Sequence, residues 1–147
     1  MFRLLVLALC LASPVAAQTV SDCETWQTSA RNLAEPWDTY SRTFANGDVR
    51  VALLDTIEPA AGAFYLIVLT PPYDELGSRK CALVSEGDGI GFAGMRFTAM
   101  RASYDAATGL TLTTPVQRFD PVSGGYVLQR LDVTINQATG LITARAY

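Results

Sequence analysis

Residue types that carry acid–base or nucleophilic chemistry are few in this sequence. Its 147 residues include no histidine, which excludes Ser-His-Asp and Cys-His catalysis and histidine metal ligands. Lys80 is the only lysine, and no serine stands at the S-x-x-K spacing that places a nucleophile beside it. We therefore predict no catalytic residue, no metal and no cofactor.

Carboxylates are more numerous, and they occur as close pairs in segments that read as loops. Asp74-Glu75 and Glu86 with Asp88 are two such pairs, and neither has the D-x-[DN]-x-[DN]-G spacing of an EF-hand. Paired carboxylates can hydrolyse a glycosidic bond, so a carboxylate-based hydrolase of the cell envelope stays open as an alternative. The simpler interpretation is that these acids are solvated turn residues.

A glycine motif runs from Gly89 to Gly94 and matches G-x-G-x-x-G. A dinucleotide site needs a strand before the motif and a helix after it, and the residues after Gly94 have the pattern of a strand. We interpret these glycines as positions of close backbone approach or strand bending.

The three cysteines predict one disulfide. Cys10 lies in the apolar N-terminal stretch, which leaves Cys23 and Cys81, 58 residues apart. An oxidising compartment favours a bond between them, and two buried thiols or an intermolecular bond are the alternatives.

The first 17 residues have the order of a secretory signal peptide. Arg3 precedes the apolar run LLVLALCLA, and small residues end at Ala17. Cleavage there removes one positive charge and changes the formal net charge from −3 to −4. We expect a periplasmic protein, or failing that a secreted one, with no membrane anchor after cleavage. The 14 Asp and Glu residues outnumber the 11 Lys and Arg residues, so the sequence does not predict the basic surface that binds nucleic acid.

Residues 18–36 are predicted to form one helix of the mature domain. Ser21 and Glu24 have capping-box spacing, Trp26, Ala30 and Leu33 form an apolar stripe, and Pro36 ends the pattern.

Residues 37–147 are predicted to form an antiparallel β domain. Seven turn-like sequences, among them Asn46-Gly47, separate eight apolar or alternating runs. Short connections favour a meander, closed as a barrel or folded as a flattened barrel or sandwich, with the helix packed on it. The expected strands are 39–45, 48–57, 63–70, 80–86, 90–103, 110–119, 126–135 and 141–146.

Alternation within these runs predicts which side chains are buried. The run 63–69 is apolar on both faces and should be covered on both, with the helix as the second cover. Arg96 shares parity with apolar neighbours and is predicted to point inward, where it could pair with Asp55. The predicted core contains Trp26, Val51, Leu53, Phe64, Leu66, Val68, Phe92, Leu112, Leu131 and Val133.

The predicted function is binding of a small ligand or an envelope protein partner by an exported all-β module. An inhibitor-like or structural envelope protein is a further alternative. If the sheet closes into a barrel, the 70–79 loop is the longest loop and is the expected lid over one end of the barrel. Its residues Tyr73, Asp74 and Arg79, together with Arg96, are the predicted binding residues because they combine an aromatic surface, an acceptor and planar cations.

Overall fold

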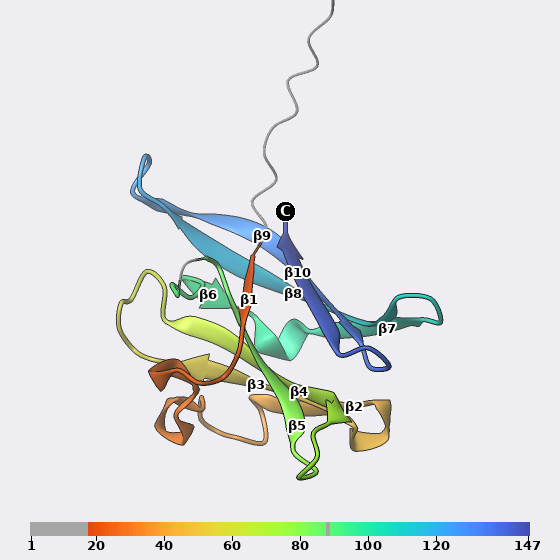
Figure 1. Ribbon diagram of the computed structural model, residues 1–147. Helices are drawn as coiled ribbons and strands as arrows, with labels where there is room; N and C mark the ends of the chain where they lie inside the picture. The colour runs from red at the N-terminus through yellow and green to blue at the C-terminus, as the bar shows by residue number, and fades with distance from the viewer. Residues whose placement is uncertain (1–17, 88) are drawn as a thin grey trace, which may run out of the picture.

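The computed structural model describes residues 18–87 and 89–147, so the predicted signal peptide at 1–17 lies outside the described residues. Two antiparallel sheets face each other (Figure 1). The first sheet has the order β1-β5-β4-β3-β2, and the second has the order β10-β9-β8 with β6 and β7 both paired to β8. The bounds in the first sheet are β1 (Thr19–Ser21), β2 (Ser41–Phe44), β3 (Val49–Asp55), β4 (Phe64–Tyr73) and β5 (Arg79–Ser85). Those in the second are β6 (Gly94–Met95), β7 (Arg101–Asp105), β8 (Gly109–Asp120), β9 (Gly125–Asn136) and β10 (Leu141–Ala146).

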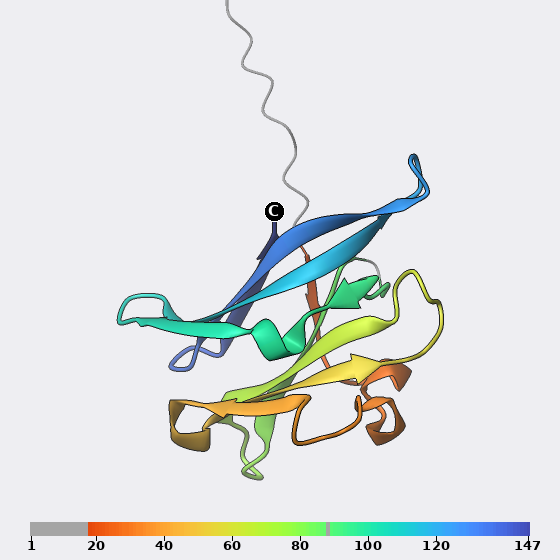
Figure 2. The same cartoon turned by 180° about the vertical axis from the view of Figure 1, so that it is seen from behind.

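The predicted antiparallel β architecture is confirmed. It consists of two successive meanders, β2 to β5 and β7 to β10, one in each sheet. Over the described residues the sheets form no closed barrel. The hairpin predicted at Asn46-Gly47 is confirmed, but its connection is longer than the expected two residues, because Phe44 pairs with Val49 and a 3-10 helix, η3 (Ala45–Gly47), lies between β2 and β3. Asn46 and Gly47 have positive φ (55° and 95°), and so does Ala45 (52°). Seen from behind, the two layers remain separate along most of their length (Figure 2).

One expected strand, 90–103, is interrupted. β6 and β7 are separated by a short 3-10 helix, η4 (Phe97–Ala99). Pro115 of β8 lies opposite this segment, and its carbonyl accepts a hydrogen bond from Arg96 N (2.9 Å). Proline has no N–H to return, so the ladder cannot continue here. The Thr114 hydroxyl instead donates to the Arg96 carbonyl (3.0 Å).

The predicted N-terminal helix is wrong. Residues 19–21 form β1, which pairs with β5, and two 3-10 helices follow, η1 (Trp26–Thr28) and η2 (Ala30–Asn32). Within the described ranges, no helix reaches seven residues, and none is long and apolar enough to cross a bilayer. Ser21, expected as a helix cap, is instead paired with Leu83.

Polar side chains in this segment take the backbone partners that a helix would need. The Thr28 hydroxyl lies within hydrogen-bond distance of the carbonyl oxygens of Cys23 (2.5 Å) and Thr25 (2.7 Å), and its single hydrogen can be donated to either. The Asn32 amide donates to the carbonyls of Trp26 (3.0 Å) and Gln27 (2.9 Å). Such local bonds compete with helical hydrogen bonds. We call residues 22–40, which run from β1 to β2, the N-terminal segment.

Apolar side chains of both sheets form the main core between the layers. Trp26 is 62% exposed, so its place in the predicted core is wrong, and Phe64 is half-buried against the core. The other eight predicted core residues are buried: Val51, Leu53, Leu66, Val68, Phe92, Leu112, Leu131 and Val133.

The first sheet also buries side chains on its outer face. Leu54, Tyr65 and Leu83 form a second cluster, against which Leu33 of the N-terminal segment packs. The expectation that the run 63–69 is covered on both faces is therefore confirmed for Tyr65, although the cover is an irregular segment and not a helix. The cover is incomplete toward β2, and the uncovered part forms the site described next.

Candidate functional site

The floor of the candidate site is the part of the outer face of β3 and β4 that the N-terminal segment leaves open. Ala52 on β3 lies opposite Ile67 on β4, and Arg50 lies opposite Leu69. Because side chains alternate along a strand, these residues point away from the main core that Val51 enters. The small side chain of Ala52 leaves room above the floor.

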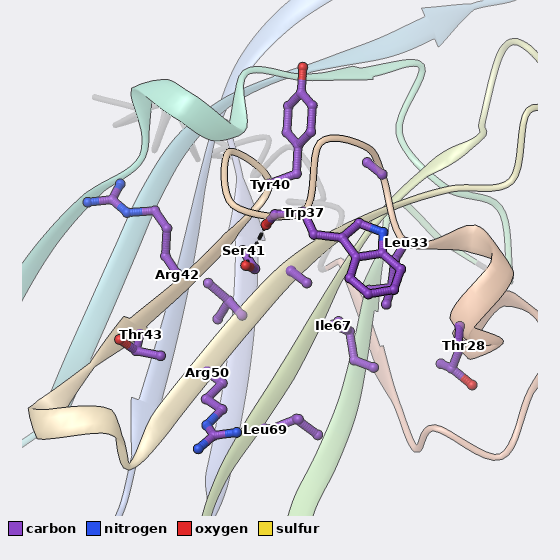
Figure 3. A pocket seen from close by; sticks show the side chains of 14 residues that line it. Thr28, Leu33, Trp37, Tyr40, Ser41, Arg42, Thr43, Arg50, Ile67 and Leu69 are labelled. Atoms are coloured by element: carbon purple, nitrogen blue, oxygen red, sulfur yellow. Dashed lines mark hydrogen bonds between the residues drawn. The ribbon is translucent and has the colours of Figure 1, made fainter.

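The wall of the site is the N-terminal segment. An isolated bridge joins Leu33 to Leu54, and Ala34 N donates to the Leu53 carbonyl (3.0 Å), which attaches the segment along β3. The chain then turns back toward β2, and the Ser41 hydroxyl donates to the Trp37 carbonyl (2.6 Å). The indole of Trp37, 60% exposed, stands beside Leu33 at one end of the site (Figure 3).

Together the floor and the wall enclose a groove of about 570 Å³. Its lining is mainly apolar; it also includes serine, threonine and two arginine residues and contains no Asp, Glu or Cys. The lining residues are Thr28, Ala30, Leu33, Ala34, Trp37, Tyr40, Ser41, Arg42, Thr43, Arg50, Val51, Ala52, Ile67 and Leu69.

The two arginines of the groove differ in their contacts. Arg42 donates to the Met100 carbonyl (2.7 Å), and its guanidinium lies 5.2 Å from the centroid of the Phe44 ring. This arginine connects β2 to the second sheet. Arg50 is exposed on β3, and within 18–87 and 89–147 no acceptor is hydrogen-bonded or ion-paired to its guanidinium. In Figure 3 its side chain lies beside Leu69, away from Trp37.

The predicted disulfide is confirmed, and it supports the wall of the groove. Cys23 and Cys81 are bonded, with their Cα atoms 5.6 Å apart. Cys81 lies opposite Leu69 on the outer face of the sheet. The bond therefore fastens the start of the N-terminal segment beside the floor of the groove.

The predicted binding residues of the 70–79 loop lie elsewhere. Tyr73 and Arg79 are paired in register, and the guanidinium of Arg79 lies 5.5 Å from the centroid of the Tyr73 ring. Arg79 also donates to the Asp48 carbonyl (3.3 Å). None of these residues lines the groove, and the sheet has no barrel mouth for the loop to cover. Their role in binding stays a prediction.

Asp74 has a structural role in its turn. Its Oδ1 accepts bonds from Ser78 N (2.7 Å) and Leu76 N (2.9 Å). The bond from the Ser78 backbone is the main reason why the pKa of Asp74 is lowered from its ordinary value. This arrangement agrees with the interpretation of the loop acids as turn residues. Across the described ranges, no group of three metal-ligating side chains comes together.

The predicted inward position of Arg96 is wrong. Arg96 is exposed and precedes η4 with φ −87° and ψ 67°, so counting alternate residues through it does not assign a face. Asp55, its predicted partner, accepts a bond from Ile57 N (2.8 Å). The described part of the chain contains no ion pair between Arg96 and Asp55.

The glycine motif is structural at its centre, as predicted. A Cβ on Gly91 would lie 2.6 Å from the Phe64 carbonyl oxygen and 2.7 Å from that of Gly62. The neighbouring Phe92 forms an isolated bridge with Phe64. The motif therefore lets two backbones approach closely.

The sequence reasoning missed the groove residues Trp37, Arg50, Ala52, Ile67 and Leu69. One signal was available, because the run 63–69 is apolar on both faces. That pattern predicts a covered strand, but it does not say how far the cover extends. Comparison of the chain with protein-family models, curated proteins and solved structures finds no match.

Proposed function

We propose that this chain is an exported, periplasmic binding module that takes a small apolar ligand in the groove on the outer face of its first sheet. The supporting observation is the groove itself, whose volume of about 570 Å³ lies within the range of about 300–1,000 Å³ usual for small-molecule sites. Export is supported by the signal-like residues 1–17 and agrees with the Cys23–Cys81 bond.

The composition of the groove favours binding over hydrolysis. A glycosidase-like mechanism needs two carboxylates about 5 to 9 Å apart around the substrate. The lining of the groove has no carboxylate, and the acids of the 70–79 loop lie outside it.

Binding of the neutral fluorescent probe N-phenyl-1-naphthylamine tests this proposal. The Ala52→Phe variant places a ring over the floor, so we expect it to lose most of the fluorescence increase that the unmodified protein gives. Ala102→Phe is the matched control, because Ala102 is exposed on β7 of the other sheet. Equal binding by all three proteins, or no binding by the unmodified protein, would contradict the proposal.

A second candidate function is docking to a protein partner through the β8–β9 hairpin, which extends beyond the sandwich (Figure 1). Phe119 and Tyr126 pack edge to face there (centroids 5.9 Å apart), and Val122 at the tip is 94% exposed. Exposed aromatic and aliphatic groups together are typical of interaction sites. A photo-crosslinker at Val122 should capture a defined protein in the periplasm, whereas one at Ala106 should not.

A further inference from the structure

The polar side chains of the groove can donate hydrogen bonds to a ligand, and two of them, Arg42 and Arg50, also carry a full positive charge. Arg50 stands between Thr43 on β2 and Leu69 on β4. Within the described residues its guanidinium has neither a carboxylate nor a carbonyl partner. By contrast, Arg42 is held by the Met100 carbonyl, and the Ser41 hydroxyl by the Trp37 carbonyl. Arg50 is therefore the cation of the groove that is available to a ligand.

The electrostatic character of the lining excludes a cationic ligand group. Because no Asp or Glu lines the groove, an ammonium group would meet the Arg50 charge without any compensating carboxylate. A carboxylate, in contrast, can accept two parallel bonds from a guanidinium. The Thr43 side chain lies directly across from Arg50 in the sheet, and its hydroxyl offers a further donor.

The apolar part of the groove extends from this charge along β3. Arg50 and Leu54 are four residues apart on one strand, which corresponds to about 13 Å at 3.3 Å per residue. The bridge between Leu33 and Leu54 lies toward that end, and Trp37 stands beside Leu33 (Figure 3). Between the two ends the floor is formed by Ala52 and Ile67. A ligand that fits has its charge at one end and an apolar body of two rings or a medium-length chain.

We infer that the groove binds an amphipathic carboxylate, with the anionic group on Arg50 and the apolar body over Ala52 and Ile67 beside Trp37. This inference rests on the proposed function and adds the chemical class of the ligand. Aromatic acids and medium-chain fatty acids share this chemistry, and 2-naphthoate and decanoate serve as the two probes.

The test compares each carboxylate with a neutral analogue of the same body, 2-naphthalenemethanol and 1-decanol. Binding is followed by the fluorescence of Trp37 in a Trp26→Phe background, since Trp26 and Trp37 are the two tryptophans of the chain. We expect at least one carboxylate to bind about tenfold more tightly than its alcohol, as a charge-assisted hydrogen bond provides. Arg50→Gln should remove that preference and leave binding of the alcohols unchanged. Arg145→Gln, on the outer face of β10 in the other sheet, should retain it.

The possible failures separate the two proposals. If carboxylates and alcohols bind equally, or if Arg50→Gln keeps the preference, the inference about the ligand class is wrong and the groove remains a site for neutral molecules. If neither carboxylates nor alcohols bind, the proposed function is wrong and the inference fails with it. A preference lost equally in Arg145→Gln would show a general charge effect and would also overturn the role of Arg50.

Discussion

At the scale of single residues, aspartates that start turns contribute to stability through their ionised form. Asp74, Asp105 and Asp120 each accept bonds from backbone N–H groups of their own turns. For Asp74 and Asp105 a backbone bond is the main cause of the lowered pKa, and for Asp120 it is the bond from the Ser123 hydroxyl. A lowered pKa in the folded state stabilises the protein above the ordinary value of 3.8, and this contribution is lost as the pH falls through the folded pKa.

We therefore expect the melting temperature of the protein to fall as the pH is lowered from 5 toward 2. In the triple variant Asp74→Asn, Asp105→Asn, Asp120→Asn, the fall should be smaller, because the three linked protonations are absent. Thermal unfolding followed by circular dichroism at several pH values measures the difference. Identical pH profiles for the two proteins would contradict a stabilising role of these carboxylates.

Two leucines of β9 provide a second residue-scale prediction. Leu131 is fully buried between the sheets, whereas Leu128 is 66% exposed three residues earlier on the same strand. Leu131→Ala should lower the free energy of unfolding by about 2–5 kcal/mol, because it removes buried contacts and leaves a cavity. Leu128→Ala should change it by less than about 0.5 kcal/mol. Urea denaturation of both variants decides whether the assigned face of β9 is correct.

At the scale of elements, the disulfide fastens the start of the N-terminal segment, and the Leu33–Leu54 bridge attaches its middle to β3. Its only helices are the three-residue η1 and η2, and its start is bonded to β5 through Cys23–Cys81. For a separation of 58 residues the chain-entropy model gives a stabilisation of about 4 kcal/mol.

The variant Cys23→Ser, Cys81→Ser should therefore unfold at lower urea concentration, and its groove should bind N-phenyl-1-naphthylamine more weakly. Limited proteolysis should cut the variant within residues 24–37 before it cuts the strands, because these residues form the segment that the bond fastens. Resistance of this segment equal to that of the disulfide-bonded protein would show that Leu33 and its neighbours hold it without the bond.

At the scale of the whole molecule, the two layers carry opposite net charge. Residues 18–87, which contain the first sheet, have ten Asp and Glu and five Lys and Arg. Residues 89–147, which contain the second sheet, have three Asp and five Arg. The groove thus places Arg50, an exposed arginine with no carboxylate partner among residues 18–87 and 89–147, in the acidic layer.

A further whole-molecule prediction concerns maturation of the chain. The protein recovered after export should have the mass of residues 18–147, reduced by two hydrogen atoms for the disulfide. Intact mass spectrometry under non-reducing conditions measures both changes at once. A mass that includes residues 1–17, or one increased by a lipid, would contradict cleavage after Ala17.

The sequence by itself determined most of the strands, the places of the turns and the disulfide of this protein, but not β1 or the interruption between β6 and β7. Alternation in runs such as 110–119 and positive-φ turns such as Asn46-Gly47 are local features, so they survive in any antiparallel arrangement. The pairing of Cys23 with Cys81 followed because the third cysteine, Cys10, lies in the predicted signal peptide.

Only the tertiary structure decided the state of residues 18–36 and the existence of the groove. The capping-box spacing of Ser21 and Glu24 is also local, but pairing of Ser21 with Leu83 and the bond at Cys23 act over long sequence distances and override it. The groove exists because the N-terminal segment covers Leu54 and Tyr65 on the outer face of the first sheet and leaves Ala52 and Ile67 open. How far a cover reaches over a sheet depends on packing between distant residues, which no local pattern encodes.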